Sequence, residues 1–172
     1  IYDQRIGGDG FGSNIHRTNA SLMLGSLYYA QVRKSTNGGT TWASSCSGIT
    51  ECGNNATAPF NTGIVAWDGS ATGDQVYTWS NTKVYRSTNY GGSWTALGVT
   101  GLPTTSFFVR GVGVAFSNAN TMALIANGGR VYTSTNGGTS WTQAANPPNN
   151  DLSMSSVHFD PANSSTIYLS SV

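Results

Sequence analysis

Apolar and polar residues alternate in many short runs along the chain, and these runs are separated by turns rich in Gly, Asn and Ser. Residues 75–79 (Gln-Val-Tyr-Thr-Trp) form one such run. Residues 111–116 form another, followed by a turn at 117–120 and an apolar run at 121–126. A period of two with β-branched and aromatic residues is typical of β-strands. The pattern therefore predicts an all-β protein built from short strands joined by tight turns.

A segment of the form Ser-x-Asn-x-Gly-x-Ser/Thr-Trp occurs three times, at residues 35–42, 87–94 and 134–141. In each copy a strand-like run leads into a turn of Asn and Gly, which tolerate positive φ, so each copy predicts a β-hairpin. The first serines are separated by 52 and then 47 residues, a period that suits a unit of about four strands. The residues assigned to these structural hairpins are Ser35, Asn37, Gly39, Trp42, Ser87, Asn89, Gly91, Trp94, Ser134, Asn136, Gly138 and Trp141.

The repeats divide the chain into units of blade size. We expect four-stranded antiparallel β-propeller blades, about three and a half of them, forming part of a larger propeller. The expected divisions are residues 1–45 (blade 1, whose N-terminal part is a loop or belongs to a previous blade), 46–62 (a disulfide-containing loop), 63–97 (blade 2), 98–109 (a loop), 110–144 (blade 3) and 145–172 (a linker and the start of blade 4). Because an arc of blades leaves its end faces open, the expected partners are the remaining blades of the same propeller or another protein chain.

The eight-residue pattern resembles the Asp-box, also called the BNR repeat, of sialidases, family 74 xyloglucanases, sortilin-type receptors and photosystem II assembly propellers. The resemblance implies a propeller whose box hairpins hold each blade together and lie away from the ligand face. In this chain the aspartate of the family is replaced by Asn37, Asn89 and Asn136. Asparagine keeps a side-chain acceptor for the turn but removes the charge. Because hard cations need several carboxylates, we expect no metal ion in these loops, and no cofactor.

Composition narrows the class of protein. Only 9% of residues are charged and the net charge is +1, whereas 11% of residues are aromatic. The aromatic content argues against a disordered chain, and the lack of a basic stripe argues against nucleic-acid binding. No apolar stretch reaches the ~18 residues of a transmembrane helix, so we expect no membrane insertion. A surface hydrated by hydroxyls and amides favours an extracellular protein, either secreted or on the cell surface.

The two cysteines, Cys46 and Cys52, lie six residues apart in a segment rich in Ser, Gly and Asn. We interpret them as a local disulfide, which agrees with an extracellular protein; the alternative is a pair of free thiols. Two thiols without a nearby histidine are too few for a structural zinc site.

Glycoside cleavage needs two carboxyl groups about 5–10 Å apart. The functional face of such blades is built by the loops between the second and third strands and by the loops between blades. The acids expected near this face are Asp3, Asp9, Glu51 and Asp151. The catalytic aspartate that family 74 enzymes carry between the second and third strands has no counterpart here, and the arginine context of sialidases is missing. No catalytic residue is therefore assigned.

Candidate ligand-binding residues are Tyr28, Tyr29 and Trp79, whose rings could stack on sugars, and Asp9, which lies between two glycines. The alternative for the aromatics is packing between blades, and the alternative for Asp9 is a turn in which its side chain bonds the backbone. Three functions stay open: a non-catalytic structural, scaffold or binding module; part of a glycoside hydrolase whose catalytic residues lie elsewhere; and a carbohydrate-binding propeller. Glycans are the expected partners of the last two.

Overall fold

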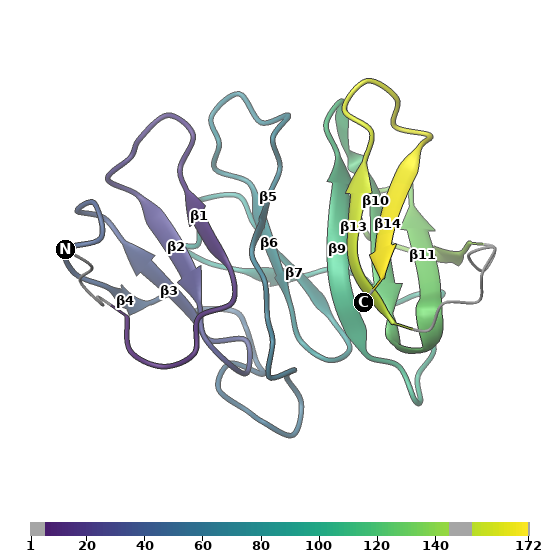
Figure 1. Cartoon of the computed structure of the whole chain (residues 1–172), viewed down its shortest axis with the longest axis horizontal. Coiled ribbons are helices and arrows are strands. Elements are labelled where there is room, and N and C mark those ends of the chain that lie inside the picture. Colours follow the sequence, from purple (N-terminus) through teal and green to yellow (C-terminus); the bar gives the residue numbers. More distant parts are fainter. Residues whose placement is uncertain (1–5, 145–152, 172) are drawn as a thin grey trace.

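The computed structural model describes residues 6–144 and 153–171. The strands form three four-stranded antiparallel sheets and one two-stranded sheet. The three four-stranded sheets stand side by side in chain order, and the two-stranded sheet lies in front of the third in Figure 1 and packs against it. The first sheet consists of β1 (Ser13–Ile15), β2 (Met23–Ser26), β3 (Val32–Ser35) and β4 (Ala43–Ser44); the second of β5 (Val65–Ala66), β6 (Val76–Trp79), β7 (Val84–Ser87) and β8 (Thr95–Ala96). The third consists of β9 (Val109–Ala115), β10 (Asn118–Ala126), β11 (Arg130–Ser134) and β12 (Thr142–Gln143), with a 3-10 turn at Asn127–Gly129; β13 (Met154–Phe159) pairs with β14 (Ile167–Ser171).

The three four-stranded sheets share one register. The first serine of the repeat lies at the end of the third strand and pairs with Met23, Val76 and Met122 of the second strands. Within each sheet the strands follow chain order, so each blade is a simple up-and-down unit. The repeated sequence thus occupies the same place in every blade, and residues of different blades can be compared position by position.

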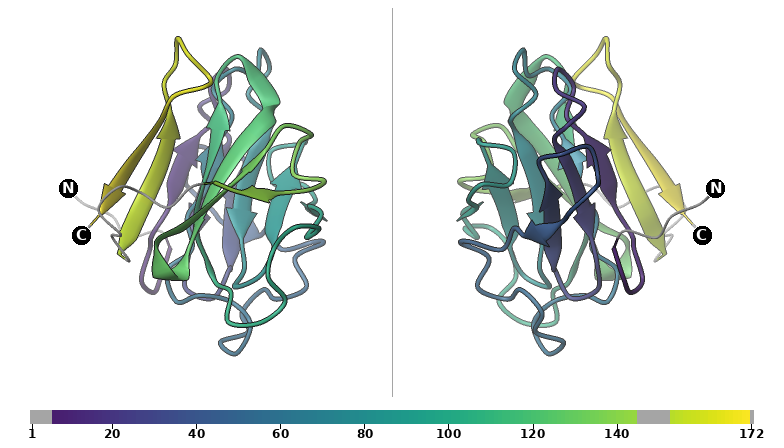
Figure 2. Two further views of the ribbon diagram at one scale, coloured as in Figure 1. Left: turned by 90° about the vertical axis from the view of Figure 1, so that its right-hand side faces the viewer. Right: turned by 90° about the vertical axis from the view of Figure 1, so that its left-hand side faces the viewer.

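The hydrophobic cores lie between neighbouring sheets, which stack face to face when the molecule is seen from the side (Figure 2). Because successive side chains of a strand point to opposite faces, Val76 packs toward the first sheet and Tyr77 toward the third. The two-stranded sheet packs through Val157 against Ala123 and Ile125 of β10. Each core belongs to two sheets, so the blades stabilise one another in chain order.

The three repeat hairpins (Ser35–Trp42, Ser87–Trp94 and Ser134–Trp141) are held by the same internal hydrogen bonds. In the second hairpin the Ser87 hydroxyl accepts bonds from the backbone N–H groups of Asn89 (3.3 Å) and Gly91 (2.8 Å). Asn89 Oδ1 accepts from the Ser93 backbone N–H at 2.9 Å, and Asn89 Nδ2 donates to Ser93 Oγ at 3.1 Å. The equivalent bonds occur in the other two hairpins. Asparagine therefore acts here as both acceptor and donor, which aspartate could not do.

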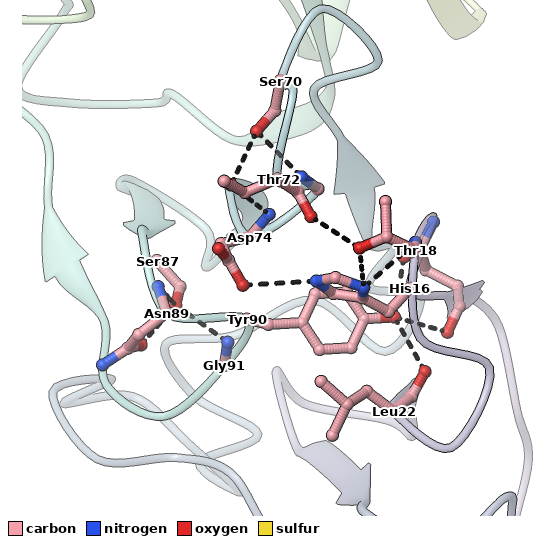
Figure 3. A network of polar contacts seen from close by, with 12 residues as sticks. His16, Thr18, Leu22, Ser70, Thr72, Asp74, Ser87, Asn89, Tyr90 and Gly91 are labelled. Carbon is pink, nitrogen blue, oxygen red and sulfur yellow. Dashed lines mark hydrogen bonds and ion pairs between the residues drawn. The ribbon is translucent and has the colours of Figure 1, made fainter.

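A partly buried polar network joins the first and second sheets at the end where the hairpins lie (Figure 3). His16 Nδ1 accepts a bond from the Thr18 backbone N–H at 3.3 Å, so the ring proton is on Nε2, which faces Asp74 Oδ1 at 3.2 Å. The Tyr90 ring packs edge-on against His16, and its hydroxyl donates to Asn14 Oδ1 at 2.9 Å. Burial raises the pKa of Tyr90, so this hydroxyl stays a donor. The network joins the first two blades at one end of their junction.

Candidate binding face

The loops between second and third strands gather with the loops between blades at the end of the molecule opposite the hairpins, the lower end in Figure 1. Backbone hydrogen bonds connect them: Tyr29 N–H donates to the Pro59 carbonyl at 3.1 Å, and Asn81 N–H donates to the Thr57 carbonyl at 3.0 Å. In the third blade the Asn127 N–H donates to the Phe108 carbonyl at 2.9 Å. These bonds form a continuous loop face, which is where the sequence analysis expects ligand binding.

An aromatic cluster of Phe11, Tyr28, Tyr29 and Phe60 lies on this face. Phe60 is central: its ring stacks on Tyr28 with centroids 6.0 Å apart and contacts Tyr29 and Phe11 edge-on at 5.6 and 5.3 Å. Phe60 is 50% exposed and Phe11 is 37% exposed, while both tyrosines are half-buried. A cluster of aromatic rings that leaves this much apolar surface in water is typical of a binding site.

The backbone beneath the cluster is strained. Tyr29 and Ala30 both have positive φ angles, 58° and 56°, although neither is glycine. The strain is held by neighbours, since the Gly53 N–H donates to the Tyr29 carbonyl at 2.7 Å and the Ala30 N–H donates to the buried Thr62 hydroxyl at 3.1 Å. Such backbone costs about 1–3 kcal/mol per residue and is concentrated at functional sites. The tyrosine pair is therefore presented in a fixed orientation.

Two of the four candidate ligand residues, Tyr28 and Tyr29, belong to the cluster, and a third lies close to it. Asp9 is exposed, and the residue before it, Gly8, lies against the Tyr28 ring. The fourth, Trp79, lies elsewhere: it is 7% exposed and packs in the core between the second and third sheets. The reason is strand alternation, which places Trp79 on the same face of β6 as Tyr77.

Phe11 and Phe60 are members of the cluster that the sequence analysis did not single out. Both are isolated aromatics in Gly- or Pro-containing loops, outside the strand runs, and that position is the signal that could have indicated exposure.

Glu51, the other acid on the face, is held in place by hydrogen bonds. Its carboxylate accepts a bond from Lys83 Nζ at 2.6 Å and another from the Tyr85 hydroxyl. Burial raises the pKa of Glu51, but the hydrogen bonds from Lys83 and Tyr85 outweigh it, and the pKa is lowered overall. A carboxylate kept ionised and bonded in this way is suited to joining two blades and poorly suited to acting as a general acid.

Cys46 and Cys52 form a disulfide, which closes the linker that carries Glu51. The described acids outside this face, Asp68, Asp74 and Asp160, lie in the turns at the opposite end of the blades. Asp3 and Asp151 lie outside the described residues. Asp9 and Glu51 are thus the described carboxylates of the loop face.

Among residues 6–144 and 153–171, no helix has the length and apolarity needed to cross a bilayer, and no three His, Cys, Asp or Glu side chains come together as a metal site.

A comparison with protein-family models finds no match, and a comparison with curated proteins finds none either. Solved structures of similar fold include an ancestral GH74 enzyme, with a TM-score of 0.74 and 18% identity over 96% of this chain and 24% of that chain. YCF48 bound to D1 peptide has a TM-score of 0.57 and 15% identity over 79% and 40% of the two chains. A chain from the COPII outer coat vertex on membranes has a TM-score of 0.62 and 12% identity over 96% of this chain and 44% of that chain.

The sheets are therefore blades of a β-propeller, and the predicted all-β fold of about three and a half blades is confirmed. The chain spans less than half the length of each of these proteins. At such identities the similarity shows the fold alone, and propellers of this kind include both enzymes and other proteins.

Proposed function

We propose that this chain is a non-catalytic binding module of a secreted or cell-surface protein, built from Asp-box-type propeller blades, with the loop face as its ligand-binding surface. The observation that carries the proposal is the aromatic cluster, half-exposed at Phe60 and mounted on the strained backbone of Tyr29 and Ala30. Strained backbone that fixes the half-buried Tyr29 ring beside the exposed Phe60 ring is explained if the cluster meets a ligand. The disulfide supports an extracellular location.

The ligand class that best suits this cluster is a carbohydrate. Sugar rings present flat C–H faces that pack on exposed aromatic rings, and the nearby Asp9 carboxylate can accept hydrogen bonds from hydroxyls. Within the described residues the loop face offers no cluster of cations that would favour an anionic ligand instead: Lys83 is already paired with Glu51.

Part of a glycoside hydrolase is the second candidate, favoured by the fold similarity to a GH74 enzyme. In that case the catalytic carboxylates would lie on other blades, because Glu51 is bound by Lys83 and Tyr85 and Asp9 has no second carboxylate beside it among the described acids. The two candidates differ in whether the complete propeller that contains these blades releases reducing ends from a polysaccharide, because the isolated chain carries no catalytic carboxylate pair in either case.

The test is an isothermal titration calorimetry experiment in which soluble polysaccharides, xyloglucan among them, are titrated into the chain. We expect saturable binding that Phe60→Ala weakens about five- to tenfold, which corresponds to the roughly 1–1.4 kcal/mol of one aromatic contact. The matched control is Phe116→Ala, because Phe116 is 47% exposed but lies at the hairpin end. Equal losses in both variants, or no binding to any glycan, would contradict the carbohydrate site. Release of reducing ends by the complete propeller that contains these blades would favour the hydrolase.

A further inference from the structure

Within residues 6–144 and 153–171, no blade covers the face of the first sheet that points away from the second sheet. This face lines a cavity of about 420 Å³ whose walls include Ile15, Met23, Gly25 and Trp42. By the shared register, Met23 corresponds to Val76 and Met122, and the box tryptophan Trp42 corresponds to Trp94 and Trp141. Those counterparts are buried against the preceding blade, so the molecule itself shows, twice, what covers such a face.

In both junctions the cover is the linker that follows the box hairpin of the preceding blade. The Trp94 indole N–H donates to the Ser45 carbonyl at 2.7 Å, and its backbone N–H donates to the Ser47 carbonyl at 2.8 Å. Gly48 then turns with φ of 95° directly against the Trp94 carbonyl, where a Cβ would lie 1.9 Å from that oxygen. Ile49 follows and is buried in the core that contains Trp94.

The junction between the second and third blades repeats this geometry. The Trp141 indole N–H donates to the Gly98 carbonyl at 3.0 Å, and its backbone N–H donates to the Thr100 carbonyl at 2.9 Å. Gly101 has φ of 88° and the same approach of 1.9 Å to the Trp141 carbonyl, and Leu102 packs against the core. The cover is thus a Ser/Thr-Gly-Ile/Leu segment in a fixed pose, which we name the clasp.

Trp42 shows how the first blade differs. Its indole N–H donates to the Gly39 carbonyl of its own hairpin, at 3.0 Å, and the ring is half-buried. Ile6 lies near it and lines the same cavity, but the cavity remains. The box tryptophans of the second and third blades donate to the linker carrying the clasp, whereas Trp42 of the first blade donates to its own hairpin.

The open face of the first blade also differs from the equivalent faces of the second and third blades by a cationic side chain. Arg33 stands two residues before the box serine, where the second and third blades have Tyr85 and Tyr132. At the first junction the Tyr85 hydroxyl donates to Glu51, which lies three residues after the clasp glycine Gly48. Within the described part of the chain the Arg33 guanidinium makes no hydrogen bond and no ion pair. A carboxylate at the position of Glu51 would therefore meet a guanidinium at the first blade, a stronger pairing than with tyrosine.

We propose that the open face of the first blade binds the linker of another propeller blade, through a Ser/Thr-Gly-Ile/Leu clasp that is followed within a few residues by Asp or Glu. The clasp carbonyl replaces Gly39 as acceptor of the Trp42 indole N–H, and the acid pairs with Arg33. A second copy of this chain does not fit as the occupant, because both of its clasps, at Gly48 and Gly101, are already bound in its own junctions.

The probe is an oxidised peptide with the sequence of residues 44–53 (SSCSGITECG), which holds a clasp and its glutamate. The full chain, labelled with ¹⁵N at tryptophan, is titrated with this peptide while the indole N–H signals are recorded. We expect a saturable shift of the Trp42 signal, with those of Trp94 and Trp141 unchanged. A peptide with Gly48→Val should not bind, because its Cβ would collide with the tryptophan carbonyl.

The charge pairing is tested by a double-mutant cycle. A peptide with Glu51→Gln should bind the native chain about three- to fivefold more weakly than the unsubstituted peptide does, as expected for an exposed ion pair. The two peptides should bind the Arg33→Gln chain with equal affinity, because the ion pair is absent there. The absence of a Trp42 shift at several millimolar peptide overturns the proposal, as does a shift confined to Trp94 or Trp141. A Trp42 shift that depends on protein concentration without peptide would show self-association and overturn the named occupant. Equal affinity of both peptides for the native chain overturns the acidic part.

Discussion

At the scale of single residues, the box asparagines show what their position requires. Asn89 Oδ1 accepts the Ser93 N–H, and its Nδ2 donates to the Ser93 hydroxyl. If the carbonyl oxygen is the part that matters, a carboxylate serves equally well, because the Ser93 hydroxyl can rotate and become the donor. The position then selects an acceptor for the turn rather than a charge.

The corresponding prediction compares two substitutions of Asn89. Asn89→Asp should leave the free energy of unfolding within about 0.5 kcal/mol of the native value. Asn89→Ala should lower it by about 1–2 kcal/mol, because the Ser93 N–H loses its acceptor. Urea unfolding measures both, with Thr88→Ala, an exposed neighbour, as the control. Equal losses in the Asp and Ala variants would mean that the amide donor matters more than the acceptor.

Glu51 gives a prediction of pH dependence. Its lowered pKa means that the folded protein favours the ionised carboxylate. Glu51 therefore stabilises the fold above its ordinary pKa of 4.5, and this contribution is lost as the pH falls through the lower pKa of the folded state. In Lys83→Met, which removes its ion-pair partner, the pKa of Glu51 measured by NMR should rise. An unchanged pKa in that variant would show that the ion pair is not its cause.

At the scale of elements, the junction between blades depends on a linker glycine. Gly48 has φ of 95°, and a Cβ there would lie 1.9 Å from the Trp94 carbonyl oxygen. Gly38, at the tip of the first hairpin, has φ of 66° but open space around it, so it provides a matched control. The two glycines separate the cost of backbone strain from the cost of a collision.

We expect Gly38→Ala to lower the free energy of unfolding by about 1 kcal/mol, from the strain of positive φ alone. Gly48→Ala should lower it by a further 1–3 kcal/mol or so, because the clasp must move away from Trp94. Urea unfolding followed by tryptophan fluorescence measures both. Similar losses in the two variants would show that the linker adjusts freely and that the clasp is not a fixed contact.

The residues of the loop face could be predicted only in part from the sequence, because they come from different elements. Tyr28 and Tyr29 form a conspicuous pair in a predicted loop, and they do lie on that face. Phe60 reaches them from the linker between two blades, across about 30 residues of sequence, and no periodic pattern marks that meeting. Trp79 ends a predicted strand, and the sequence alone leaves open whether its ring packs between blades or stacks on a ligand. Its burial depends on the third blade, which packs Phe107 and Val109 into the same core.

At the scale of the whole molecule, stability is shared between neighbouring blades. The second and third sheets each take part in two cores, whereas the two-stranded sheet of β13 and β14 takes part, within the described residues, in a single core that contains Val157. Tyr168 on its other face is 57% exposed. In a nearest-neighbour array, a unit with one interface opens more readily than a unit with two.

Amides of β13 and β14 should therefore exchange with deuterium at least tenfold faster than those of β6 and β10 under native conditions. Val157→Ala should accelerate exchange in β13 and β14 while leaving β6 unchanged, because it weakens only the last core. Exchange followed by mass spectrometry with peptide resolution tests both statements. Uniform protection across all sheets would mean that the blades open as a single cooperative unit.

The sequence by itself determined the class of fold, because a blade is a local structure. The hairpin that repeats three times is held by bonds within eight residues, and its period of about 50 residues leaves room for four strands and little else. Each of these interactions can be recognised without knowing what lies next to the blade.

Only the tertiary structure decided which side chains form sites, because those depend on contacts between blades. The meeting of Phe60 with the tyrosines, the pairing of Glu51 with Lys83 and the burial of Trp79 all join segments that are distant in sequence. Three identical tryptophans in the repeat acquire different partners for the same reason: two bond the linker of a preceding blade, and Trp42 bonds its own turn. The local pattern specifies the blade, and the neighbour specifies the use of its faces.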